Sequence, residues 1–93
     1  MAVVHVPGKE SGHIMLYALS TCGWCRKTRE LLEELGVAYD YEYVDLLRGA
    51  DRERAVREMT VWNPGVSFPT LVLDDKKSII GFKENDIRGA LGK

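Results

Sequence analysis

Apolar residues follow two different spacings along the chain, and these spacings divide it into expected strands and helices. Residues 14–19 form an uninterrupted apolar run bounded by polar residues, which is typical of a strand buried on both faces in a parallel sheet. Residues 39–44 alternate with period two, which predicts a half-buried strand toward an edge of the sheet. Residues 70–73 and 78–80 flank the polar segment 74–77, and this arrangement predicts an antiparallel hairpin.

Three segments show helical spacing instead. In residues 24–35 an apolar stripe recurs every three or four positions and ends at Gly36, while Ser20-Thr21 precedes it as a candidate cap. Residues 51–62 carry a second stripe, and Asn63-Pro64-Gly65 breaks that helix. A short last helix is expected around Ile87.

The order strand, helix, strand, helix, strand, strand, helix predicts an α/β domain with a four-stranded mixed sheet and helices on both faces. A right-handed crossover should join the first two strands. Residues 13–93 are expected to form a single domain, preceded by a tail or an extra edge strand in residues 1–12.

Charge and hydropathy exclude several classes of function. The 93 residues carry 13 Lys and Arg against 14 Asp and Glu, a net charge of −1, so DNA, RNA and anionic membranes are poor candidates as partners. No apolar run has the length of a membrane span, and residues 1–12 lack the basic and apolar regions of a signal peptide. We therefore expect a cytoplasmic protein.

The two cysteines lie in one motif, Cys22-Gly23-Trp24-Cys25, that opens the first predicted helix. The positive end of the helix dipole favours a thiolate at Cys22, which should be the attacking nucleophile. Cys25 lies one turn further along on the apolar stripe, so it should be more buried and act as the resolving thiol.

Basic residues crowd the start of this helix, where the dipole disfavours them. Arg26 and Lys27 would place positive potential beside a Cys22 thiolate. The alternative is that these residues are solvated and form i,i+4 pairs, Arg26 with Glu30 and Arg29 with Glu33.

A Cys-x-x-Cys motif can also be half of a zinc site. The remaining ligands would have to include His5 and His13, which precede the motif and do not form a second ligand pair at finger or ribbon spacing. Redox chemistry is the better interpretation, because the motif follows a strand and opens a helix, and we expect no metal site.

A second candidate segment is Ser67-Phe68-Pro69-Thr70, at the start of the third predicted strand. A proline that enters a central strand is unusual, because it has no N–H for the ladder. A cis bond between Phe68 and Pro69 in a turn beside the active site would explain it. The alternative is a trans proline that marks the beginning of the strand.

Residues 17–35 with the cysteine motif, then Phe68-Pro69-Thr70 and residues 81–87, resemble a glutaredoxin-like member of the thioredoxin superfamily. The resemblance covers roughly residues 14–91 and implies a thioredoxin fold. It implies that Cys22 is the nucleophile, Cys25 the resolving cysteine and Pro69 the cis-proline. It also implies a substrate site, in which Trp24 forms one wall of the groove and the Phe68 backbone binds the substrate, made up of Thr21, Gly23, Trp24, Phe68, Pro69, Thr70, Lys83 and Asp86.

The chain also departs from this family. Leu19 stands where glutaredoxins usually carry Lys or Arg, and Phe82 replaces the second glycine of a Gly-Gly pair. This form is similar to glutaredoxin-like redoxins that donate electrons to ribonucleotide reductase. Asp86 could still receive a substrate ammonium and Lys83 a carboxylate, although both are also ordinary first-turn residues of a helix.

The resemblance implies a thiol:disulfide oxidoreductase that acts on protein disulfides or on mixed disulfides between protein and a small thiol. No tightly bound cofactor is expected, and glutathione, another small thiol or an NADPH-dependent flavin reductase would supply electrons. We expect a monomer or a weak dimer. Two alternatives remain: a [2Fe-2S] cluster carrier, and an interaction module whose cysteine motif is idle.

Overall fold

The apolar run found in the sequence is the central strand of a mixed sheet in the computed structural model, which describes residues 3–92. This strand, β2 (Ile14–Ala18), is buried at every position. It pairs in parallel with β3 (Tyr39–Tyr43) and antiparallel with β4 (Thr70–Leu73), and β4 pairs antiparallel with β5 (Lys77–Ile80). The parallel pair and the terminal hairpin confirm the predicted mixed sheet.

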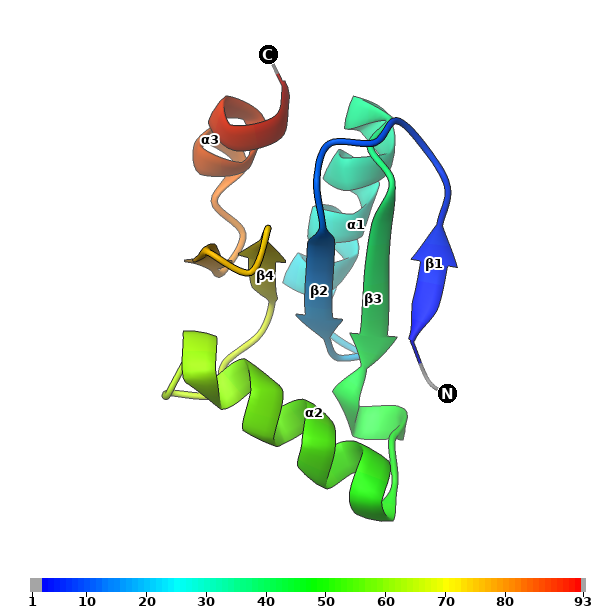
Figure 1. The fold of residues 1–93 in the computed structure, drawn as a ribbon, viewed down its shortest axis with the longest axis vertical. Coiled ribbons are helices and arrows are strands. Elements are labelled where there is room, and N and C mark those ends of the chain that lie inside the picture. Colours follow the sequence, from blue (N-terminus) through cyan, green and yellow to red (C-terminus); the bar gives the residue numbers. More distant parts are fainter. Residues whose placement is uncertain (1–2, 93) are drawn as a thin grey trace.

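The sheet has five strands, so the predicted number of four is wrong. The additional strand is β1 (Val4–Val6), which pairs antiparallel with β3 and gives the order β1-β3-β2-β4-β5 (Figure 1). β3 therefore lies toward one edge of the sheet, second from it, with β1 along its outer side. Residues 1–2 of the expected tail and residue 93 of the expected domain lie outside the described residues.

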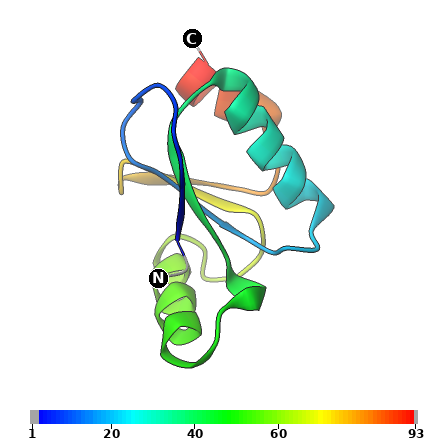
Figure 2. The same cartoon turned by 90° about the vertical axis from the view of Figure 1, so that its right-hand side faces the viewer.

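The helices occupy opposite sides of the sheet, as predicted, and Figure 2 shows α1 (Gly23–Leu35) on one side and α2 (Gly49–Trp62) on the other. A 3₁₀ turn (Val44–Leu46) leads from β3 toward α2, which begins two residues before the predicted position. A short α3 (Glu84–Ile87) and a π turn (Arg88–Gly92) complete the chain.

The side chains of β2 alternate between two separate hydrophobic layers, one on each face of the sheet. Ile14, Leu16 and Ala18 pack in the layer below α1, whereas Met15 and Tyr17 pack toward α2. Because successive side chains of a strand point to opposite faces, the all-apolar run follows directly from this two-sided burial.

Helix α1 follows the predicted apolar stripe closely. Cys25, Thr28, Leu31 and Leu32 are its buried residues. Gly36 ends the helix at φ 73°, a left-handed conformation that glycine adopts without a Cβ penalty, and its N–H donates to the Glu33 carbonyl at 3.1 Å.

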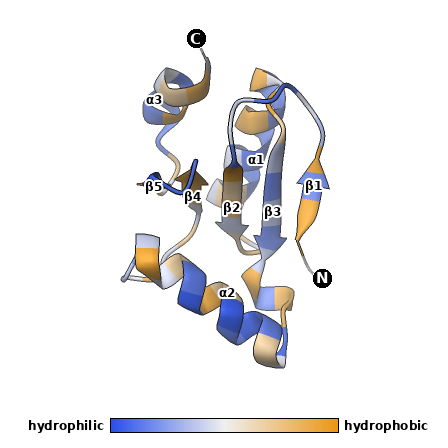
Figure 3. Ribbon diagram, in the orientation of Figure 1, coloured by the Kyte–Doolittle hydropathy of each residue, from blue (hydrophilic) through white to orange (hydrophobic). Residues whose placement is uncertain are grey.

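The buried stripe of helix α2 is narrower than that of α1. Ala55 and Met59 are fully buried against the sheet. Most of its other residues are hydrophilic (Figure 3). It therefore covers only part of its face of the sheet, at the lower end in the view of Figure 1.

Candidate active site

The thiol of Cys22 caps helix α1. The Cys22 backbone is extended (φ −95°, ψ 118°), and its Sγ accepts a hydrogen bond from the backbone N–H of Cys25 at 3.2 Å. The prediction that Ser20-Thr21 caps the helix is wrong, because the capping atom comes from the catalytic cysteine candidate itself. The Cys22 sulfur thus lies at the N-terminus of α1, with a backbone N–H directed at it.

The two thiols differ as the sequence predicts. Both are free, Cys22 is half-buried and Cys25 is 1% exposed. Burial, and next the hydrogen bond with Cys22, raise the pKa of the Cys25 thiol to about 12. Cys25 therefore stays protonated at neutral pH, and an external disulfide reaches Cys22 first.

The segment that precedes Cys22 is tied to the end of β3. Asp45, in the 3₁₀ turn, accepts hydrogen bonds from both the backbone N–H and the hydroxyl of Ser20. The Ser20 hydroxyl is the main reason why the pKa of Asp45 is lowered. The Cys22 N–H donates to the Leu19 carbonyl at 3.3 Å. These contacts fix the direction in which the chain enters α1.

The bond between Phe68 and Pro69 is cis, as predicted. Tyr17 pairs with Thr70 in the antiparallel register of β2 and β4, so Pro69 lies beside the end of β2, from which the chain passes to Cys22. Phe68 and Cys22 both pack against the layer below α1. The fold thus brings the cysteine motif and the proline segment together.

A buried asparagine holds the proline segment in place. The side-chain amide of Asn63 donates to the carbonyl and hydroxyl of Ser67 and to the hydroxyl of Thr70, each at 3.0 Å. Thr70 is fully buried and donates its own hydroxyl to the Ser67 carbonyl at 2.8 Å. Its side chain is committed inside the protein, so the expected contribution of Thr70 to substrate binding does not come from its hydroxyl.

An aromatic pair borders the site. Trp24 is 59% exposed and stacks on Phe82, with ring centroids 5.7 Å apart and planes inclined by 24°. The Gly81 N–H donates to the Pro69 carbonyl at 2.9 Å. Three segments that are distant in sequence, residues 21–25, 67–70 and 81–83, therefore meet at one end of the sheet.

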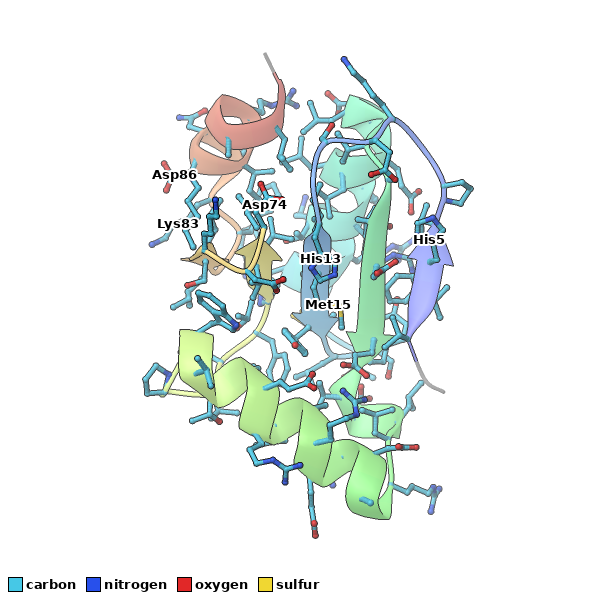
Figure 4. All side chains as sticks on the ribbon, viewed as in Figure 1. His5, His13, Met15, Asp74, Lys83 and Asp86 are labelled. Carbon is cyan, nitrogen blue, oxygen red and sulfur yellow. The ribbon has the colours of Figure 1, made fainter. Side chains whose placement is uncertain are left out.

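The remaining candidates lie at the surface around these segments. Thr21 and Gly23 are exposed, and Gly23 has open space where a Cβ would stand. Lys83 is exposed at the residue before α3, and Asp86 is exposed on α3 itself (Figure 4). Within residues 3–92 neither has an ion-pair partner, which leaves both charges available to a ligand.

The basic residues of α1 divide between two roles. Arg26 is highly exposed and lies 3.5 Å from Glu30, as the i,i+4 alternative predicts, and Lys27 is exposed. Arg29 bonds to Glu33 at 3.1 Å but also donates to Tyr39 and Tyr43 on β3. Arg29 therefore supports the packing of α1 on the sheet, and only Arg26 and Lys27 remain as sources of potential near Cys22.

Comparison with known proteins decides the family. The family model of glutaredoxin matches residues 14–78. The chain belongs to the glutaredoxin family.

This glutaredoxin is similar to two solved archaeal structures. The glutaredoxin of Methanosarcina mazei is 50% identical, with a TM-score of 0.91 over 100% of this chain and 90% of that one. The methanoredoxin of Methanosarcina acetivorans is 50% identical, with a TM-score of 0.89 over 92% of this chain and 90% of that one. The Gene 56 protein of Mycobacterium phage D29 is 30% identical over 74 residues, which are 80% of this chain and 77% of the relative.

Family and fold together support a thiol redox function for this glutaredoxin, in a thioredoxin-like fold. In the part of the chain that the structure describes, no three His, Cys, Asp or Glu residues are grouped as metal ligands. Among the same residues, none of the helices combines the length and the apolar character needed to cross a bilayer.

Sequence reasoning missed two residues that shape this glutaredoxin site, Asp45 and Asn63. The sequence Asn63-Pro64-Gly65 indicates only the end of a helix, and Asp45 follows a strand without any local motif. Asp45 contacts Ser20, which is 25 residues away in the sequence, and Asn63 acts across a turn on Ser67 and Thr70, so no periodicity could reveal them.

Proposed function

We propose that this protein is a thiol:disulfide oxidoreductase that reduces protein disulfides, or mixed disulfides between protein and a small thiol, through Cys22 and Cys25. One observation carries the proposal: the Cys22 sulfur, at the start of α1, accepts the Cys25 N–H, while the second thiol lies buried directly behind it. An accessible activated sulfur backed by a protonated reserve thiol suits sequential disulfide exchange.

The chemistry would run in two exchanges. The Cys22 thiolate attacks one sulfur of the substrate disulfide, a mixed disulfide forms, and the other substrate sulfur leaves as a thiolate that takes up a proton. Cys25 then loses its proton and attacks the Cys22 sulfur, which forms the Cys22–Cys25 disulfide and releases the second substrate thiol. The substrate gains two electrons from the protein and two protons; one proton is released by Cys25, and the other comes from solvent and equals the one that Cys22 gives up when it ionises.

The surroundings suit a substrate that brings a disulfide within an extended segment. Trp24 and Phe82 offer an apolar border, and the Phe68 backbone lies in the segment that reaches the cysteine motif. Lys83 directly follows Phe82 in the chain and Asp86 lies one turn further along on α3, and these two exposed residues offer one charge of each sign. We infer that protein disulfides, including those of reductases such as ribonucleotide reductase, belong to the substrate class.

Single-cysteine variants test the assignment. With a protein disulfide as substrate, both Cys22→Ser and Cys25→Ser should lose turnover. With a mixed disulfide between a protein and a small thiol, Cys25→Ser should retain activity, because the first exchange needs only Cys22. Turnover by Cys22→Ser on either substrate would contradict the proposal.

The electron donor is tested on the oxidised protein. Its reduction is followed with glutathione alone and, in parallel, with NADPH and thioredoxin reductase. We expect the reductase to act faster, because Leu19 removes one charge and the Phe82 ring occupies the place of a glycine. Faster reduction by glutathione would contradict this expectation. Visible absorbance of protein purified without oxygen would instead support the [2Fe-2S] carrier.

A further inference from the structure

A hollow of about 440 Å³ lies between the sheet and α2, apart from the redox site. Met15 and Asp40 are partners in the register of β2 and β3, as are Tyr17 and Glu42, so these four side chains form two adjacent rows on one face of the sheet. Figure 4 shows His13 and Met15 on the face turned to the viewer, above α2. None of Cys22, Cys25 and Pro69 lines this hollow.

Glu42 is the least expected residue of this hollow. Period-two alternation predicts a solvent-facing side chain, yet Glu42 is fully buried, because α2 covers this part of β3. Its Oε1 accepts from Arg54 at 3.0 Å. Its Oε2 has no hydrogen-bond partner among residues 3–92. An unpartnered buried carboxylate oxygen is costly, and in a native protein it calls for a ligand or an ordered water.

The hydrogen-bond donors of the side chains around Glu42 already have other acceptors. Arg54 divides its guanidinium between Glu42 and Glu58, and the Tyr17 hydroxyl donates to Glu58 at 3.2 Å. Burial, and next the charge of Glu58, raise the pKa of Tyr17, so its hydroxyl keeps the proton for this bond. A donor for Glu42 Oε2 therefore has to come from outside this group of side chains.

The charge of the hollow indicates the sign of that ligand. Four carboxylates line it, those of Asp40, Glu42, Glu58 and Asp75, against the guanidinium of Arg54 and the imidazole of His13. The His13 ring lies 3.8 Å from Asp40 and 3.4 Å from Asp75, so at most two cationic side chains face the four carboxylates. An anion would meet this excess of negative charge, whereas a cation would be attracted by it.

The apolar part of the lining indicates the rest of the ligand. Met15, Val72 and half-buried Trp62 contribute carbon surface, and Trp62 offers an aromatic ring to a cation. A bare metal ion would gain nothing from these walls. A cationic group at the end of a methylene chain would use both parts of the hollow.

We propose that this hollow binds an alkylammonium group, with an ammonium N–H donated to Glu42 Oε2 and the methylene chain against Met15, Val72 and Trp62. The same chemistry is supplied by a free diamine or by a lysine side chain of another protein. Binding is independent of the redox state of Cys22, because the hollow contains neither cysteine.

Amide and indole chemical shifts of the reduced full-length protein test this proposal. The titrants are cadaverine, Nα-acetyl-lysine methylamide and, as a neutral compound of equal chain length, pentanol. Both ammonium compounds should give saturating shifts at Met15, Tyr17 and Trp62, and pentanol should not. The tighter of the two ammonium compounds identifies the source. Equal shifts with pentanol, or no saturation with either ammonium compound, would overturn the proposal.

Variants with matched charge changes localise the effect. Glu42→Gln should weaken binding by about tenfold or more, since it removes a buried charged acceptor. Glu53→Gln changes the net charge equally but lies outside the hollow on α2, and should bind as the wild type does. Cys22→Ser should also bind normally. Unchanged binding by Glu42→Gln would mean that Oε2 holds a water only, and would overturn the proposal.

Glu42→Gln could lose its fold, because Arg54 would lose a partner, and circular dichroism checks this first. Asp75→Asn then provides an independent test. Asp75 is an exposed rim residue whose φ of 52° asparagine tolerates well. This variant should weaken binding of cadaverine by about two- to fivefold. No weakening by Asp75→Asn would count against the site.

Discussion

Replacing Asn63 with alanine removes the amide that holds the proline segment next to the cysteine motif. The amide has two hydrogens and three acceptors within 3.0 Å, so the loss amounts to two good hydrogen bonds. The bond that the Gly65 N–H donates to its Oδ1 at 3.2 Å is lost as well. Ser67 keeps one partner, because the Thr70 hydroxyl still donates to its carbonyl.

At about 1 kcal/mol net for each hydrogen bond, Asn63→Ala should lower the free energy of unfolding by about 2–3 kcal/mol. For a domain of this size that corresponds to a fall in melting temperature of about 10–20 °C. Thermal and urea unfolding measure it. Asn85→Ala deletes the same group from an exposed position and should stay within about 0.5 kcal/mol of the wild type.

A functional readout separates positioning from stability. At a temperature where Asn63→Ala is folded, kcat/KM for a protein disulfide should fall, while the rate of alkylation of Cys22 should not, because Asn63 does not contact the thiol. An Asn63→Ala variant within about 0.5 kcal/mol of the wild type would refute this account of the proline segment.

Three further predictions concern the surroundings of the site. Burial raises the pKa of Cys25 to about 12, so the unfolded chain loses this proton at a lower pH than the folded protein does. The free energy of unfolding of the reduced protein, measured in urea, should therefore fall as pH rises above about 9, and it should fall less steeply in Cys25→Ala. Equal pH slopes of the two proteins would exclude this linkage. Asp45→Ala should lower the free energy of unfolding by about 1 kcal/mol and slow disulfide exchange, and Asp45→Asn should lie between the wild type and Asp45→Ala in both measurements. Equal behaviour of the two variants would contradict the role given to Ser20. Val66 has φ 49° and is 37% exposed, so Val66→Asn should raise stability by roughly 0.5–1 kcal/mol, and a lower melting temperature would argue against strain there.

Elements governed by local pattern could be predicted from the sequence. The run at residues 14–19 indicated a strand covered on both sides, and the two apolar segments around residues 74–77 indicated the hairpin. The cysteine motif and the proline at the start of β4 indicated the redox site, because each carries its chemistry within a few residues.

Features that depend on contacts between distant residues could not be predicted. For residues 1–12 the sequence left open a tail or an extra edge strand, and nothing local indicates that the three residues of β1 pair with β3. The alternation of polar and apolar residues in β3 predicts that Glu42 faces solvent, and only the position of α2 in the fold shows that it is buried. The roles of Asn63 and Asp45 follow only from the fold, which places Ser67 next to Asn63 and Ser20 next to Asp45.

The most direct test of the central claim is the intact mass of each single-cysteine variant after incubation with a protein disulfide. Cys25→Ser should accumulate a mixed disulfide in which Cys22 is joined to the substrate, because no second thiol can release it. Cys22→Ser should remain unmodified under the same conditions, since Cys25 is buried and protonated. A substrate adduct on Cys25 in Cys22→Ser, or none on Cys22 in Cys25→Ser, would contradict the assignment of Cys22 as the attacking thiol.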